Sequence, residues 1–126
     1  MEDTQLRSTV RVIKWAILMV ATAARLERIK HLARTEPSLP ASVEFEPDEI
    51  EATILLKREY KKRTERIPSS MPTMGQITLW LAELGGYMGP KSSGGPPGSI
   101  TIKRGLDFVL PAAAVIAHLR KMGKLR

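Results

Sequence analysis

The chain contains no cysteine among its 126 residues. Disulfide bonds and thiolate metal sites are therefore excluded. The two histidines, His31 and His118, lie far apart without the spacing typical of metal ligands, so we expect no metal and no cofactor. Neither histidine has a serine and an acid placed beside it in a recognisable motif, so no catalytic residue is predicted and an enzyme is not expected.

Aromatic residues are also scarce, at 5%, although 43% of the residues are hydrophobic. A core must therefore be built from aliphatic side chains and methionine. The longest apolar run, from Trp15 to Ala24, has ten residues including Thr22, whereas a membrane-spanning helix needs about twenty. The N-terminus is acidic, unlike a signal peptide. We expect one cytoplasmic domain or a piece of one, with no membrane partner.

Positive charge is unevenly distributed along the chain, which carries a net charge of +7. Residues 1–34 hold seven bases and three acids, residues 35–56 hold six acids and no base, and residues 57–126 hold thirteen bases and four acids. The net charge therefore understates the two basic regions, because the acidic region between them partly cancels their charge. This pattern favours a polyanionic partner, most simply nucleic acid, over an evenly solvated surface.

Hydrophobic periodicity predicts an all-α fold of about four helices. Apolar residues at alternating steps of four and three predict a long helix over residues 5–34; they are Leu6, Val10, Ile13, Ile17, Val20 and Ala24. Residues 15–24 are apolar on nearly all sides, which predicts burial by a neighbour that this chain does not supply. Prolines predict an extended linker over residues 35–47, and a second helix follows over residues 48–66 with a basic C-terminal end.

The remaining pattern predicts two more helical segments. Thr73 and Gln76 form a capping box before an apolar face, and Gly85-Gly86 should end that helix. We expect Ser99 to cap the last helix, and Pro111 to kink or divide it.

Between these segments, residues 84–98 contain six glycines and three prolines. Such a composition predicts a shaped loop, whose exposed amides, hydroxyls and lysine suit contact with a phosphate backbone. A purely structural connection between helices explains the same residues equally well. Gly85 and Lys91-Ser92 have the spacing of a nucleotide-binding P-loop, but Pro90 replaces its second glycine and the segment follows a helix instead of a strand. Nucleotide binding is therefore not predicted.

Several short motifs occur together in a fixed order. They are Pro72-Thr73, Trp80-Leu81-Ala82-Glu83-Leu84-Gly85-Gly86-Tyr87, Lys91-Ser92 with Gly94, Pro96-Pro97-Gly98 and Arg104-Gly105-Leu106. Together they resemble the C-terminal part of bacterial cut-and-paste DDE transposases of the Tn5 type. Upstream, Glu46-Pro47-Asp48-Glu49 resembles the start of a helix in that family, and the helix around Arg25-Leu26 resembles the one that leaves the catalytic core.

The resemblance implies a division of the chain into a helix leaving the core (1–34), a linker (35–47) and a helical dimerisation domain (48–126). It implies a homodimer, or a heterodimer with full-length transposase, and contact with transposon-end DNA near the bacterial nucleoid. The residues expected to contact DNA are Lys91, Ser92, Ser93, Lys103 and Arg104. Those expected to form the dimer are Leu106, Val109, Leu110, Ala113, Ile116 and Ala117. The family's catalytic acids should lie before Met1, so the chain alone is expected to be inactive.

The sequence departs from the family pattern at the loop and just after it. Ser93 replaces an acid, Gly94-Gly95 adds a glycine, and Ser99 and Lys103 stand where tryptophan is common. Three alternatives stay open: a truncated inhibitor that pairs with full-length transposase, a decayed remnant without function, and an independent basic DNA-binding regulator. A helix-turn-helix regulator is disfavoured because no short turn joins two helices at the usual spacing.

Overall fold

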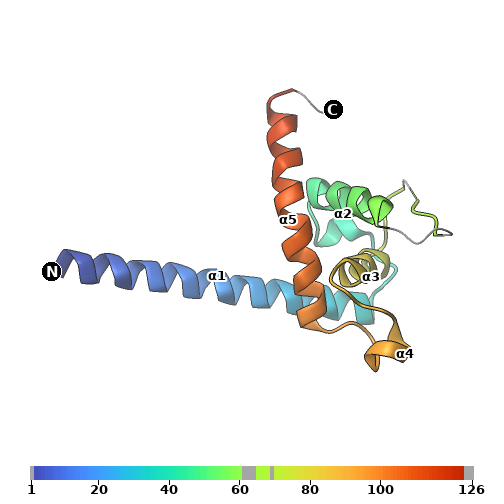
Figure 1. The fold of residues 1–126 in the computed structure, drawn as a ribbon, viewed down its shortest axis with the longest axis horizontal. Coiled ribbons are helices and arrows are strands. Elements are labelled where there is room, and N and C mark those ends of the chain that lie inside the picture. The colour runs from blue at the N-terminus through green and yellow to red at the C-terminus, as the bar shows by residue number, and fades with distance from the viewer. Residues whose placement is uncertain (1, 61–64, 69, 124–126) are drawn as a thin grey trace.

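One long helix projects from a body of shorter helices in the computed structural model, which describes residues 2–60, 65–68 and 70–123 (Figure 1). The order of elements is α1 (Glu2–Thr35), a 3₁₀ turn η1 (Ala41–Val43), α2 (Pro47–Glu59), α3 (Met74–Leu84), the short α4 (Pro90–Ser93) and α5 (Ser99–Lys121). The described residues contain no strand, only one isolated bridge between Pro40 and Thr73. The predicted all-α class is confirmed.

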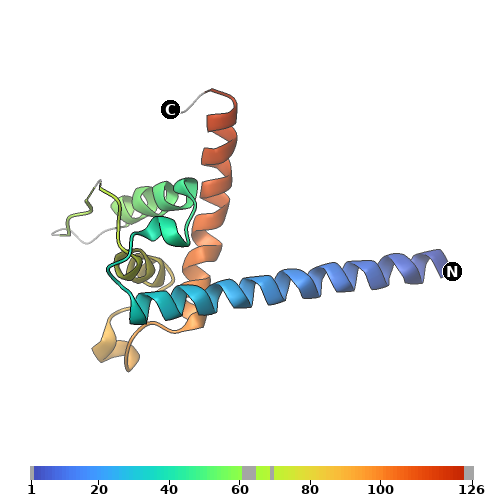
Figure 2. The same ribbon diagram turned by 180° about the vertical axis from the view of Figure 1, so that it is seen from behind.

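The helix α1 is unbroken over 34 residues, which corresponds to about 50 Å at 1.5 Å per residue. Only its C-terminal third joins the body, where Leu26 and Ile29 are buried. Residues 2–24 are exposed along their whole length, and their end lies far from the other helices in both face-on views (Figures 1 and 2). The predicted helix is therefore confirmed, and its apolar middle has no neighbour among the described residues.

The segment between α1 and α2 is not the extended linker that its prolines predict. It contains the turn η1, and Ala41 and Phe45 are buried in the core. Backbone hydrogen bonds tie it to the start of α3, with Ala41 N donating to Pro72 O at 2.9 Å and Met74 N donating to Leu39 O at 2.7 Å. These hydrogen bonds pair backbone groups that would be hydrated in an extended linker.

Helix α2 ends at Glu59, seven residues before the predicted end at residue 66. Lys57 is buried, and its ammonium lies 3.3 Å from a carboxylate oxygen of Glu65 and 3.4 Å from one of Glu83. Residues 61–64, which hold three of the six bases in the predicted basic run, lie outside the described part.

Two glycines allow α3 and α5 to approach at backbone distance. A Cβ atom at Gly105 would lie 1.8 Å from the carbonyl oxygen of Leu81, and one at Gly85 would lie 2.1 Å from that of Thr101. No side chain fits at either position, because real Cβ contacts are never that short. The Gly-Gly and Arg-Gly-Leu motifs thus have a direct packing role.

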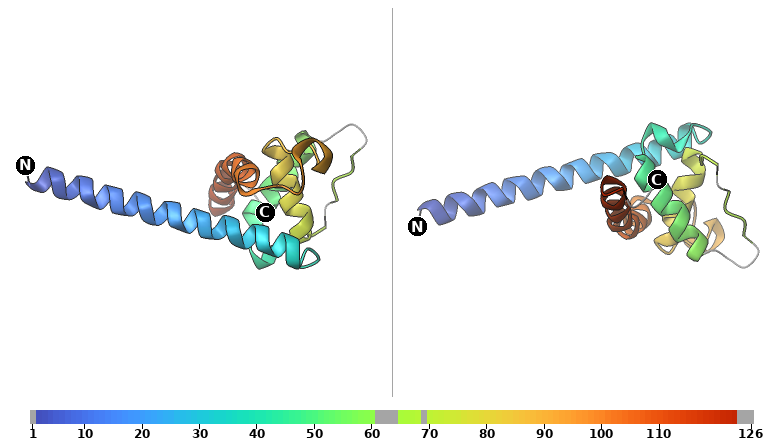
Figure 3. Two further views of the ribbon diagram at one scale, coloured as in Figure 1. Left: turned by 90° about the horizontal axis from the view of Figure 1, so that it is seen from below. Right: turned by 90° about the horizontal axis from the view of Figure 1, so that it is seen from above.

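Helix α5 forms one wall of the body and runs without interruption from Ser99 to Lys121. Pro111 does not divide it, contrary to one of the two expected outcomes. Ser99 does not cap it either: Gly98 occupies the N-cap position without a side-chain bond, and the Ser99 hydroxyl instead accepts a bond of 3.0 Å from Lys30 of α1. Views along the other axis show α5 nearly end-on beside α1 (Figure 3).

The core lies where α2, α3, α5 and the base of α1 meet. Its fully buried members come from each of these elements and include Ile29, Met74, Ile77, Leu81, Ile102 and Val109. Thr73 caps α3 by accepting a bond of 3.2 Å from Gln76 N, which is one of the two bonds of the predicted capping box. The body is therefore well packed, and α1 leaves it in one direction.

Candidate nucleic-acid and dimer interfaces

The loop between α3 and α5 has a defined shape that its glycines make possible. Gly86, Gly89, Gly94 and Gly95 all have positive φ, between 79° and 144°, a region that other residues rarely adopt. The buried Tyr87 anchors the loop, because its hydroxyl donates to the carbonyl of Gly95 at 2.9 Å. The predicted shaped loop is present, with the single-turn helix α4 inside it.

The loop displays Lys91 to solvent from the first turn of α4. Ser92 and Ser93 follow it in the same turn, but their side chains lie outside the described set. Lys103 and Arg104 lie in the first turns of α5; Lys103 pairs with Asp107 at 2.8 Å and Arg104 is exposed. Lys91 and Arg104 are therefore accessible to a polyanion. Lys103 already pairs with Asp107, which partly neutralises its charge.

Two further cations reach this region from α1, and sequence reasoning did not select them. Lys30 Nζ donates to Ser99 Oγ at 3.0 Å, and Arg34 donates to the carbonyl of Pro97 at 3.4 Å. Lys30 also pairs with Glu27 at 3.0 Å, whereas the hydrogen bond of Arg34 goes to a neutral carbonyl and its side chain is exposed. Since they are separated from the loop by more than sixty residues, no local pattern could have identified them.

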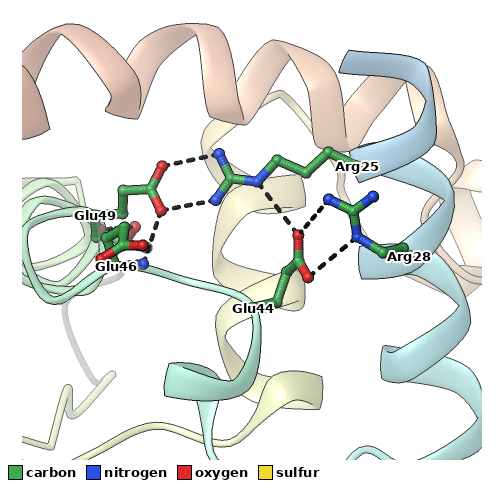
Figure 4. A network of polar contacts seen from close by, with 6 residues as sticks. Arg25, Arg28, Glu44, Glu46 and Glu49 are labelled. Carbon is green, nitrogen blue, oxygen red and sulfur yellow. Dashed lines mark hydrogen bonds and ion pairs between the residues drawn. The ribbon is translucent and has the colours of Figure 1, made fainter. Parts of the chain in front are cut away.

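A network of ion pairs fixes α1 to the start of α2 (Figure 4). The Arg25 guanidinium donates two hydrogen bonds to Glu49, at 2.7 and 2.9 Å, and lies over the ring of Phe45 at 5.4 Å. Arg28 holds Glu44 with two longer bonds of 3.2 and 3.3 Å. One carboxylate of this network also caps α2, since Glu49 accepts a bond of 2.9 Å from Glu46 N.

These contacts shift the acidity of both main partners. Burial raises the pKa of Glu49, but hydrogen bonds from Arg25 and from the backbone of Glu46 outweigh it and leave the pKa below the ordinary 4.5. The hydrogen bonds to Glu49 hold the pKa of Arg25 above its usual value despite partial burial. Both groups therefore stay charged near neutral pH, and we assign the network a structural role.

Most of the residues expected to form the dimer face the protein's own core. Leu106, Val109, Ala113 and Ile116 are buried against α2 and α3, Ala117 is half-buried, and only Leu110 is exposed, at 38%. A partner could not reach the four buried side chains without opening the body. Their alternating spacing thus reflects packing within the chain, and their role in a dimer stays a prediction.

The opposite side of α5 carries a second apolar stripe. Phe108, Pro111, Val115 and Met122 are exposed and follow one another at steps of three, four and seven, which places them on one face of the helix. Tyr60, at the end of α2, extends this stripe through an edge-to-face contact with Phe108 at 5.7 Å. Sequence reasoning did not select this stripe, because the apolar residues on the buried side of α5 form a longer regular pattern.

Two other kinds of site are not found among the described residues. No group of three or more histidine, aspartate or glutamate side chains is arranged to hold a metal ion. None of the described helices combines the length and the apolar character that a membrane span requires.

The chain was compared with known proteins in three ways. No curated protein and no solved structure matches it. A family model does match, over residues 21–120, and its description is the dimerisation domain of the Tn5 transposase. The matched range begins shortly before α1 enters the body and includes α2, α3, α4 and all but the last residue of α5. The chain therefore belongs to the family of Tn5 transposase dimerisation domains.

Proposed function

We propose that this chain pairs with a second transposase chain through the outward face of α5. The observation that supports it is the exposed stripe Phe108, Pro111 and Val115 on a helix whose opposite face is already used by the core. In a family of dimerisation domains, an apolar face left free on a rigid helix is the natural contact, since burial of such side chains drives association.

A single charge at the centre of this face tests the proposal. Val115→Glu should convert a dimer into a single chain in light scattering, because it places a carboxylate in a desolvated contact. Leu55→Glu is the matched control: Leu55 is also exposed, but on α2, so that variant should still dimerise. A Val115→Glu chain that dimerises like the unmodified protein contradicts the proposal.

We further propose that the loop and the first turns of α5 contact phosphates of transposon-end DNA. Support comes from Lys91 and Arg104, which are exposed, and from Arg34, which the fold adds beside the loop. Ser92, Ser93 and Lys103 complete the proposed contact set. Such contacts position DNA without reading its bases.

The salt dependence of DNA binding tests this contact. Lys91→Ala should reduce the slope of log affinity against log salt by about one unit, since one phosphate contact is lost. Lys121→Ala removes a cation from the far end of α5 (Figure 1) and should leave the slope unchanged. Equal slopes for Lys91→Ala and the unmodified chain in a gel-shift titration would contradict the assignment.

A second function follows from the same α5 surface. A polypeptide that keeps this surface can pair with full-length transposase and form a defective dimer. Co-expression with an active transposase of this family should lower the transposition frequency, and co-expression of Val115→Glu should not. An unchanged frequency at excess of the unmodified chain removes this second function.

A further inference from the structure

One cavity in the body combines apolar walls with hydrogen-bond donors. It has a volume of about 230 Å³ and lies where the last two turns of α1, the first half of α3 and the segment between α4 and α5 meet (Figure 1). Its apolar lining comes from these three segments and the start of α5, and consists of Ala33, Leu79, Pro96, Pro97 and Ile102. Neither the outward face of α5 nor the proposed DNA contact requires such a cavity.

A buried hydroxyl without a partner belongs to the same cavity. Thr78 lines it and is only 4% exposed. The Thr78 hydroxyl oxygen is shielded from solvent and makes no hydrogen bond to any of the described residues. Other helical threonines of this chain donate to the carbonyl four residues earlier, as Thr53 does to Glu49 at 2.7 Å. Because an unpaired buried hydroxyl is unfavourable, Thr78 favours an occupant that supplies a hydrogen-bond acceptor.

Two cations of α1 complete the lining of the cavity. Lys30 and Arg34 lie one helical turn apart, and both line it. An ammonium group has three N–H donors and a guanidinium group has five. Within the described part of the chain, the bonds to Glu27, Ser99 and the Pro97 carbonyl use only some of these donors. The remaining donors are available to an anion at the cavity.

We propose that this cavity binds a small carboxylate that carries one apolar ring. An apolar cavity of about 150 Å³ holds benzene, so about 230 Å³ has room for a ring and a carboxylate. The carboxylate only accepts hydrogen bonds, which suits two cations and the unpaired Thr78 hydroxyl. The ring replaces water against Leu79 and Ile102, which a bare phosphate ion could not do.

This binding goes beyond the proposed contact with DNA and does not depend on it. Arg34 belongs to both surfaces, so a bound carboxylate occupies one of the cations that DNA would contact. Benzoate binding is measured on the full chain without DNA. A negative result would therefore overturn the carboxylate site and leave the DNA proposal unaffected.

Benzoate is the probe, and NMR of the methyl groups in the full chain shows where it binds. Millimolar benzoate should shift the signals of Ala33, Leu79 and Ile102 to saturation and leave that of Val115, on the outward face of α5, unchanged. Benzamide has the same ring without the charge and should bind at least about fivefold more weakly. Inorganic phosphate should not shift these three signals. No saturable shift with benzoate, equal affinity for benzamide, or the same shifts with phosphate would overturn the proposal.

Thr78→Val distinguishes a ligand contact from a packing role, because it removes the hydroxyl and keeps the shape of the side chain. It should weaken benzoate binding about fivefold. It should unfold at the same or a higher urea concentration, because no hydrogen bond within the described residues is lost. Thr53→Val is the matched control: it loses the bond to Glu49 and should lower stability without changing benzoate affinity. Undiminished benzoate affinity in Thr78→Val would overturn the proposed contact.

Ala33→Leu and Arg34→Gln test the cavity and its charge separately. Ala33→Leu fills the cavity but keeps both cations, and should abolish benzoate binding. Arg34→Gln keeps the cavity and should weaken binding about tenfold. Arg11→Gln removes an exposed cation from the distant part of α1 and should have no effect. Benzoate that binds Ala33→Leu as tightly as the unmodified chain lies outside the cavity, which overturns the site. Equal losses for Arg34→Gln and Arg11→Gln would also overturn it.

Discussion

The two parts of α1 have the same helical character and opposite environments. Residues 6–24 and residues 26–35 belong to one unbroken helix, yet only the second part packs on the body, which buries Leu26 and Ile29. Ile17 and Ile29 illustrate the difference, at 62% and 0% exposed. Hydrophobic spacing thus predicts a helix, whereas burial depends on where the rest of the chain folds back.

Alanine substitution at these two isoleucines should give the largest difference in stability between the two parts of α1. Ile29→Ala should lower the free energy of unfolding by about 3 kcal/mol, because it removes buried methyl groups and leaves a cavity. Ile17→Ala should change it by less than about 0.5 kcal/mol. Urea unfolding is the measurement, at a concentration where light scattering shows single chains. Similar losses for both would mean that residues 6–24 are packed within the chain.

Disruption of the backbone contact between α3 and α5 should give the next largest loss of stability. Gly105→Ala should cost about 2 kcal/mol, because the added methyl group would collide with the Leu81 carbonyl and force the helices apart. Gly98→Ala is the matched control, since no atom lies within 4 Å of its Cβ position and its φ is negative. If Gly105→Ala unfolds at the same urea concentration as Gly98→Ala, the close approach is not real.

The ion pairs at the base of α1 should contribute less to the free energy of unfolding than the two features above. Glu49→Gln should lower stability by about 1 kcal/mol at pH 7, because the pair is only partly buried. Since the pKa of Glu49 is lowered in the folded state, its contribution is present above pH 4.5 and is lost as the pH falls below it. The difference between the two proteins should therefore narrow between pH 5 and pH 3.

Asp107→Asn is the control for this titration. Asp107 forms an exposed pair with Lys103, so its substitution should have a smaller effect at pH 7. A constant difference between the unmodified protein and Glu49→Gln across this pH range would contradict the role of the Arg25–Glu49 pair.

Local signals in the sequence predicted local structure well. The long helix, the Thr73 cap and the shaped loop were predicted and are present. The predictions that were wrong concern groups with distant partners. Ser99 bonds to Lys30 instead of capping its own helix, and α2 ends at Glu59, where Lys57 pairs with Glu65 and with Glu83 of α3.

The candidate sites show the same difference between features that depend on local sequence and features that depend on distant contacts. Lys91 and Arg104 could be selected from sequence because the loop composition is unusual, and their role in DNA contact stays a prediction. Arg34 could not be selected, since only the fold places it beside Pro97. Within α5, sequence reasoning selected one apolar stripe for the dimer, and only the fold shows that most of this stripe faces the core.

The sequence by itself determined which segments are helical, where the chain must bend and to which family it belongs, because these depend on spacing, caps and glycines within a few residues of one another. Only the tertiary structure decided which apolar faces are buried: α3 and α5 meet at backbone distance at Gly85 and Gly105, with Leu106 of α5 buried and Val115 exposed. It also decided that α1 leaves the body at Arg25, because the acidic partners Glu44 and Glu49 come from another segment.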